Sequence, residues 1–157
     1  MNLKQLLTRP LANVPTWIVW TACVVALIGF SDAAYLSVEH FINAIPPCSI
    51  TGGCESVLTS SYATILGIPV PVLGAIYYLA ILAGLFAFFD SKKEIILRWT
   101  LRATVLGFIM TTWFLYVQQF LIHAYCQYCL LSALTSTLLF IIAITSFCKY
   151  RAVDIHA

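Results

Sequence analysis

Charged side chains are scarce in this chain, and their scarcity excludes most classes of protein. Only 9% of the 157 residues are charged, whereas 62% are hydrophobic. The core of a soluble domain of this size does not need such a high fraction of hydrophobic residues, so the composition indicates an integral membrane protein. The length leaves no room for an added soluble domain beside a few membrane spans. The chain also shows no internal repeat and no low-complexity segment.

Three long stretches contain no Lys, Arg, Asp or Glu, and they set the number of membrane spans. They cover residues 10–31, 56–89 and 103–148, of which the last holds only His123 as a potential charge. A spanning helix needs about 20 residues, so the third stretch is long enough for two. We expect an all-α bundle of four transmembrane helices in a single domain over 1–157. The expected spans are 16–38, 68–89, 99–122 and 126–148, with an outer loop over 39–67.

The eight basic residues indicate how the chain is oriented in the membrane. They form clusters at the start, the middle and the end, which four spans bring to one side. The positive-inside rule makes this side the cytoplasm, so both termini are expected there, in the inner membrane of a cell. A cleaved signal peptide fits poorly, because 16–38 is too long for its apolar region and no small-x-small cleavage site follows. The clusters are Lys4 and Arg9; Lys92, Lys93, Arg98 and Arg102; and Lys149 and Arg151.

Four of the six cysteines fall at the opposite, outer end of the expected spans. Cys48 and Cys54 lie in the outer loop, while Cys126 and Cys129 form a Cys-x-x-Cys motif that opens the fourth span. Two intervening residues place the latter thiols on one face of a first helical turn, near enough to form a disulfide. The N-terminus of a helix also favours the thiolate. Disulfides persist and are exchanged outside the cytoplasm, so this placement favours redox chemistry.

Two dithiols on one side of a membrane can act as a relay, because thiol–disulfide exchange passes oxidation from pair to pair. The loop pair would meet an outside protein. The pair at the edge of the hydrocarbon would meet a lipid-soluble electron acceptor, for which a quinone is the obvious candidate. Aromatic residues near this edge are candidates for the quinone pocket, although such residues more often serve as interfacial anchors. They are Trp113, Tyr116, Tyr125 and Tyr128.

Other interpretations of the cysteines stay open. The four could form static disulfides, and in a different functional class Cys48 and Cys54 would stabilise the loop of a non-catalytic tetraspan scaffold. Zinc binding with His123 fits poorly, because five residues between Cys48 and Cys54 exceed the usual ligand spacing. We therefore expect no metal, and His123 is better explained as an interfacial polar residue. Cys23 and Cys148, near the inner side, have the pattern of small buried apolar residues.

The outer loop and the spans contain further features with a structural meaning. Gly52 and Gly53 permit a tight turn before Cys54. Apolar residues recur at helical spacing over 55–66, which predicts a short amphipathic helix on the membrane surface. Asp32 lies near the outer end of the first span, where we expect it to reach the interface, with a functional role as the alternative. Close helix contacts are expected at Gly74, Gly84 and Gly107.

In these motifs, taken in order, the chain resembles the vitamin K epoxide reductase family in its bacterial or archaeal branch. The matching elements cover nearly the whole chain. They are Tyr35-Leu36; Cys48 and Cys54 with Glu55 and Val57-Leu58; Ser60-Ser61-x-Ala63; Gly67-Ile68-Pro69 with Gly74 and Tyr77; and Cys126-Gln127-Tyr128-Cys129. The resemblance implies a four-helix bundle around a quinone, covered by the loop. It also implies a membrane thiol–quinone oxidoreductase that forms disulfides in exported proteins.

The resemblance further implies an order of electron transfer. Cys48 would exchange with a reduced thioredoxin-like partner and Cys54 with Cys126, while Cys129 would face the quinone. Ser60 would lie near the junction of loop and quinone. Many bacterial members carry a fused thioredoxin-like domain, whereas this chain ends at Ala157, so we expect a separate thioredoxin-fold oxidase as partner. No nucleic-acid partner is expected.

The resemblance also bears on the quinone. Animal members have an asparagine early in the second span and a tyrosine one turn after the Cys-x-x-Cys pair. The corresponding positions here are Val70 and Ala133. This difference favours ubiquinone or menaquinone over vitamin K epoxide, whose reduction is the alternative activity.

Overall fold

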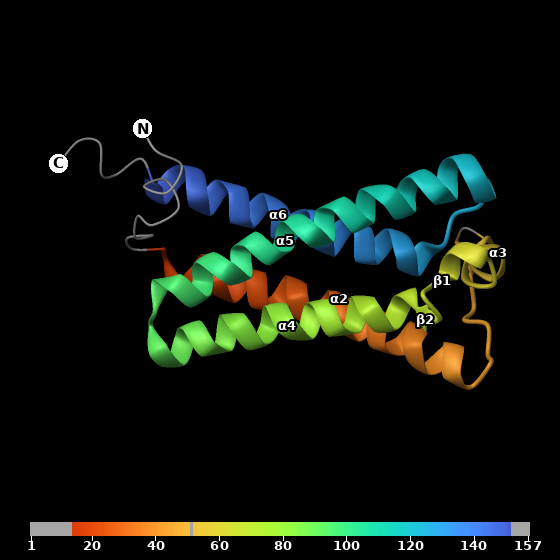
Figure 1. The fold of residues 1–157 in the computed structure, drawn as a ribbon, viewed down its shortest axis with the longest axis horizontal. Coiled ribbons are helices and arrows are strands. Elements are labelled where there is room, and N and C mark those ends of the chain that lie inside the picture. The colour runs from red at the N-terminus through yellow and green to blue at the C-terminus, as the bar shows by residue number, and fades with distance from the viewer. Residues whose placement is uncertain (1–13, 51, 152–157) are drawn as a thin grey trace.

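The protein is a bundle of four long helices in the computed structural model, which describes residues 14–50 and 52–151 (Figure 1). All four are long and apolar enough to cross a bilayer. The prediction of four helical spans is thereby confirmed, while the basic residues Lys4 and Arg9 lie outside the described residues. The helices are α2 (Thr16–Phe41), α4 (Val70–Ser91), α5 (Glu94–Tyr116), which continues as the π-helical segment η2 (Val117–Ile122), and α6 (Gln127–Arg151).

The four helices form a closed ring in which α2 and α5 are diagonal. Helix α2 packs against α4 and α6, and α5 packs against the same two. The start of α2, the end of α6 and the α4–α5 connection lie at one end of the bundle (Figure 1). The short elements between α2 and α4 lie at the other end, next to the start of α6. The fold therefore gathers the loop cysteines and the Cys-x-x-Cys motif at one end.

The helices extend beyond the spans expected from charge. Helix α2 continues to Phe41, and α5 begins at Glu94, so that Arg98 and Arg102 are helical. The positions of charged residues indicate where the hydrocarbon core of the bilayer ends, not where a helix ends, because helices continue into the interfacial region. Helix α4 starts at Val70 rather than at residue 68, since Ile68 and Pro69 belong to a short strand.

The segment before α4 is not the single amphipathic helix predicted over 55–66. Helix α3 covers only Cys54–Leu58, and it is followed by the 3₁₀ turn η1 (Ser61–Ala63) and a hairpin of β1 (Thr64–Ile65) and β2 (Ile68–Pro69). The prediction of a short helix in the loop is right, but its length is wrong. Ser60 is extended, and Leu66 and Gly67 have positive φ angles of 52° and 80°. Two such residues suit a tight hairpin turn and end any helical continuation.

Small residues let the helices approach one another closely. A Cβ at Gly84 would collide with the hydroxyl of Thr100 on α5, and one at Gly107 would collide with the hydroxyl of Tyr77 on α4. The predicted close contacts at these glycines are confirmed. A Cβ at Gly74 would meet only the Cβ of Ala33 at 3.5 Å, an ordinary contact. Helices α4 and α5 therefore lie close together at Gly84 and Gly107.

Replacing Gly84 by Ala should destabilise the bundle without altering the cysteines. The added methyl group would push against Thr100, which is buried and branched at Cβ and so has little freedom to move. Overpacking of this kind costs about 1–3 kcal/mol. Thermal unfolding in detergent should show a lower melting temperature for Gly84→Ala, whereas Gly74→Ala should unfold near the wild-type temperature. Equal melting temperatures for the two variants would contradict the close contact.

Candidate functional site

The loop between α2 and α3 carries a disulfide bond. Cys48 and Cys54 are joined, with their Cα atoms 5.8 Å apart. Cys54 opens α3 and is fully buried, whereas Cys48 is half-buried. We call residues 42–50 and 52–53 the capping loop, because they lie over the end of the bundle at which α6 begins (Figure 1). An incoming thiol can therefore approach Cys48 more readily than Cys54.

Gly53 sets how closely the capping loop approaches the Cys-x-x-Cys motif. A Cβ at this position would lie 2.6 Å from the carbonyl oxygen and 2.9 Å from the backbone nitrogen of Tyr125. Only a residue without a side chain lets the two backbones come this near. The neighbouring Gly52 has a φ of 65° and open space around it, so it serves the turn instead. Cys54 is thereby brought to the segment that precedes Cys126.

Cys126 is the N-terminal cap of α6, as the sequence predicts for a cysteine that opens the fourth span. Its carbonyl oxygen accepts the first intrahelical bond, from the backbone N–H of Leu130 at 3.0 Å. Its sulfur accepts the backbone N–H of Cys129 at 3.5 Å. The Cys126 side chain is fully buried in a small cluster with Cys54 and Val57. The sulfur that meets the loop disulfide is thus also held by the first turn of the helix.

The environment of Cys126 favours its thiolate. A hydrogen bond from the Cys129 thiol, helped by the backbone N–H groups of Cys129 and Tyr128, lowers the pKa of Cys126 to about 7, although burial acts against it. Bonds of this kind stabilise the charged form of an N-terminal cap. Cys126 is therefore a substantial fraction thiolate at neutral pH.

Two side chains next to the cysteines hold the capping loop over the motif. Gln127 donates to the carbonyl oxygen of Pro47 at 3.3 Å and accepts the backbone N–H of Ile50 at 3.1 Å. Tyr128 donates its hydroxyl proton to the same Pro47 oxygen at 3.1 Å. The two residues between the motif cysteines thus bracket Cys48 in the loop.

Gln118 ties the end of the third span to the start of the fourth. Its side-chain oxygen accepts the backbone N–H of Cys126 at 3.0 Å, and its carbonyl oxygen accepts that of Ala124 at 3.3 Å. Gln118 is 2% exposed and lies in the π-helical segment η2. Such segments are rare and frequently mark functional sites. Sequence reasoning missed this residue, although a glutamine within a long apolar run is a signal that could have revealed it.

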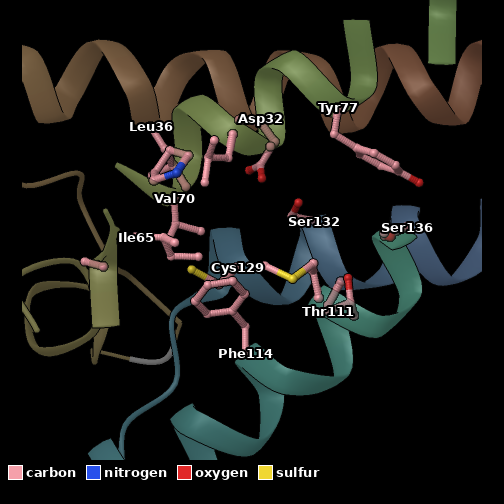
Figure 2. Close-up of a pocket in the computed structure, with 18 of the residues that line it drawn as sticks. Asp32, Leu36, Ile65, Val70, Tyr77, Thr111, Phe114, Cys129, Ser132 and Ser136 are labelled. Carbon is pink, nitrogen blue, oxygen red and sulfur yellow. The ribbon is translucent and has the colours of Figure 1, made fainter. Parts of the chain in front are cut away.

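A cavity of about 580 Å³ lies inside the bundle beneath α3, η1 and β1, and we call it the central cavity. Cys129 lies in its wall, whereas Cys126 does not. The cavity is within the usual size range of small-molecule sites and is mostly apolar. Figure 2 shows Cys129 on one side and Val70 and Leu36 opposite. The two motif cysteines therefore border different surroundings.

The predicted pocket residues divide into two groups. Ser60 lines the central cavity, with its hydroxyl donated to the carbonyl oxygen of Val57 at 2.7 Å. Trp113, Tyr116 and Tyr125 do not line it, and each is 42–50% exposed on the outside of the bundle. The wall is instead formed by Phe114 and its neighbours on the opposite face of the third span, which Figure 2 shows beside Cys129. His123 is exposed and also lies outside the cavity wall.

Asp32 does not reach the membrane interface, and that expectation is wrong. Its side chain is only 7% exposed, and it lies in the wall of the central cavity. Figure 2 shows its carboxyl group directed into the space above Cys129 and Ser132. The packing of α2 against both α4 and α6 turns this face of α2 inward.

Comparisons with known proteins agree with this arrangement of cysteines and helices. The family model described as the vitamin K epoxide reductase family matches residues 20–144. The thiol-disulfide oxidoreductase LTO1 of Arabidopsis thaliana is 33% identical over 123 residues. That match covers 72% of this chain, which spans only about a third (32%) of the relative's length.

Replacing Gly53 by Ala should lift the capping loop from Cys126. The collision with the Tyr125 backbone should cost about 1–3 kcal/mol, which corresponds to roughly 5- to 150-fold more frequent opening. Alkylation of reduced Cys126, followed by mass spectrometry, should accelerate by this factor. Gly52→Asn is the matched control, because asparagine tolerates a positive φ and meets nothing there. Equal alkylation rates in Gly53→Ala and the wild type would contradict the role of this contact.

The thiolate of Cys126 should depend on the thiol of Cys129. In a Cys48→Ala, Cys54→Ala background with the remaining pair reduced, thiolate absorbance should rise through a midpoint near pH 7. Below this pH Cys126 is a thiol, and above it a thiolate. Replacing Cys129 by Ala removes the main hydrogen-bond donor, so the midpoint should move toward the ordinary value of about 8.5. A midpoint that is the same with and without Cys129 would refute the assigned cause.

Proposed function

The chain belongs to the vitamin K epoxide reductase family, and we propose that it is a membrane enzyme that oxidises thiols of a thioredoxin-fold partner and reduces a quinone. The observation that best supports this function is the division within the Cys-x-x-Cys motif. Cys126 is buried against Cys54 of the loop, whereas Cys129 lines the central cavity. A purely structural disulfide has no need for this separation. The thiol-disulfide oxidoreductase activity named for the plant relative also supports it.

The first exchange takes place at the capping loop. A thiolate of the partner attacks the sulfur of Cys48 and expels Cys54 as a thiolate. The second partner thiol then attacks the mixed disulfide, so that the partner leaves oxidised and the loop pair is left reduced. The half-buried position of Cys48 and the full burial of Cys54 support this order. We place these steps outside the cytoplasm, where disulfide bonds persist.

The second exchange passes two electrons to the motif. The Cys54 thiolate attacks Cys126 of an oxidised Cys126–Cys129 pair and expels Cys129. Cys48 then attacks Cys54, which restores the loop disulfide and releases Cys126. A thiol of low pKa leaves quickly in such exchanges, and the pKa of Cys126 near 7 suits it for this release.

The central cavity suits the ring of a quinone, which supplies a two-electron acceptor when bound. Its walls are mostly apolar, and its volume of about 580 Å³ accommodates one or two fused rings. Cys129 lies in this wall, and so does Ser60, which connects α3 to η1. Val70 and Ala133 also line it and offer no hydrogen-bond donor from their side chains. We therefore propose ubiquinone or menaquinone as the acceptor.

Replacing Cys129 by Ala should abolish quinone reduction while leaving the loop able to react. Purified protein, a reduced thioredoxin-fold oxidase and a soluble quinone would be mixed, and quinol formation followed by absorbance. Without Cys129 the pair cannot close its disulfide, so quinol formation should fall to background. Cys126 should then accumulate in a disulfide with Cys54, which non-reducing peptide mapping would detect.

Cys148→Ala is the matched control. This cysteine is exposed, so the expectation that it is buried is wrong, and it lies near the end of α6, far from the capping loop. It should retain wild-type quinol formation. Full activity of Cys129→Ala would reject the proposed function. Cys48→Ala tests the other end of the relay, since it should block oxidation of the partner.

A further inference from the structure

The central cavity contains hydrogen-bonding groups that the protein itself leaves unused. Within the described part of the chain, three buried side-chain oxygens have no hydrogen-bond partner of good geometry: Oδ2 of Asp32 and, next to each other, Oη of Tyr77 and Oγ of Ser136. All three residues line this one cavity. Buried polar atoms are nearly always paired, and leaving one unpaired costs about 1–3 kcal/mol. Oδ2 of Asp32 therefore indicates a polar ligand rather than a purely apolar filling.

Asp32 differs from the other two because it also borders a second hollow. We call this hollow the lateral groove, and it has a volume of about 450 Å³ between α2 and α6. Among residues 14–50 and 52–151, Asp32 is the single residue that lines both hollows. Its side chain is thus a partition between the cavity that contains Cys129 and a groove on the flank of the bundle. The groove is lined by Leu27, Ile28, Ser31, Asp32, Tyr35, Tyr128 and Leu131.

Reduction of a quinone by the Cys-x-x-Cys motif requires a proton donor beside the central cavity. Reduction of a quinone to a quinol takes up two electrons and two protons. The reduced pair supplies both electrons when its disulfide forms, but its sulfurs hold fewer than two protons near neutral pH, because a substantial fraction of Cys126 is thiolate. Cys129 brings one proton, so the second must come from another group that borders the cavity.

We propose that Asp32 donates the second proton to the quinone and regains it through the lateral groove. This inference rests on the proposed quinone reduction. In the balanced step, the Cys126 thiolate and the Cys129 thiol lose two electrons and form a disulfide. The quinone gains those electrons, the proton of Cys129 and the proton of Asp32, and leaves as a quinol. Asp32 remains as a carboxylate until a proton from the groove restores the acid.

The surroundings of Asp32 support the neutral acid as its resting form. No Lys or Arg among the described residues lines either hollow, so no countercharge faces the carboxyl group. An unpaired carboxylate is expensive in such apolar surroundings. From α4, Tyr78 faces α2, but its hydroxyl is committed to Ser132 and Thr135 at 2.7–3.2 Å. Tyr77 also comes from α4, and α6 contributes Cys129.

The lateral groove offers a route for the returning proton. Tyr35 lies one helical turn beyond Asp32, and its ring lies 5.5 Å from that of Tyr128 across the groove. Tyr128 donates its hydroxyl proton to the capping loop at Pro47. Two phenol groups thus connect the region of Asp32 to the end of the bundle where the loop meets solvent.

The test replaces Asp32 by Asn and measures two half-reactions separately. Prereduced enzyme is mixed with a soluble quinone and quinol formation is followed in a single turnover. Loss of a proton donor typically costs 10²–10⁴-fold, so this step should slow by about 100-fold or more. Exchange of a small thiol with the Cys48–Cys54 disulfide, measured on the same protein, should keep its wild-type rate. Asp90→Asn is the matched control, because this aspartate is exposed at the far end of α4 and should change neither rate.

Two further readouts separate proton donation from a merely structural role. Asp32→Glu keeps the acid and should retain much of the rate. Formic or acetic acid added to Asp32→Asn should restore part of the lost rate by supplying the proton. A rate within about twofold of wild type in Asp32→Asn, or a loss that neither glutamate nor added acid relieves, would overturn the proposal. Absence of quinol formation in the wild type would overturn the proposed function and this inference together.

Discussion

The hydrogen bond from the Cys129 backbone to the Cys126 sulfur is the interaction on which the site depends. It makes a cysteine the cap of a membrane helix, a position at which a backbone N–H has no partner in the helix itself. The bond fixes Cys126 outside the first turn and leaves Cys129 inside it. The helix can then direct Cys129 toward the central cavity while Cys126 stays against Cys54. One capping bond thus separates the two halves of a dithiol, and together with the Cys129 thiol it favours the thiolate of Cys126.

The cap can perform this task only because its surroundings are rigid. Gln118 holds the backbone of Cys126 from the third span, and Gln127 holds the capping loop from the opposite side. Gly53 removes the side chain that would otherwise separate the two backbones. Each of these contacts involves a buried or half-buried polar group, and this protein has few such groups. The hydrogen-bond partner of each group is therefore strongly determined. In an otherwise apolar bundle, these polar contacts therefore hold the loop disulfide next to Cys126.

The sequence predicts the four helices well, because gaps between charges report directly on the hydrocarbon thickness. It also predicts that the motif opens the last helix. It does not predict which face of a helix points inward, since every face of these helices is apolar. Depth in the membrane therefore favours Trp113 and Tyr116 as pocket residues, whereas the cavity wall belongs to Phe114 on the other face. The helix predicted over 55–66 ends at Leu58 for a local reason, namely that the backbone of Ser60 is extended, and the chain then forms a hairpin that turns at Leu66 and Gly67.

The proposed role of Asp32 gives the buried site a constant charge. Before electron transfer the negative charge lies on the Cys126 sulfur, whose pKa a charged Asp32 would raise. A neutral Asp32 therefore favours the thiolate. When the disulfide forms, this sulfur loses its charge, and the same event leaves a carboxylate at Asp32. The apolar site never contains two negative charges, which low dielectric would make costly. Proton donation and disulfide formation then favour each other. The thiolate of Cys126 thus explains why the neighbouring cavity contains an unpaired acid.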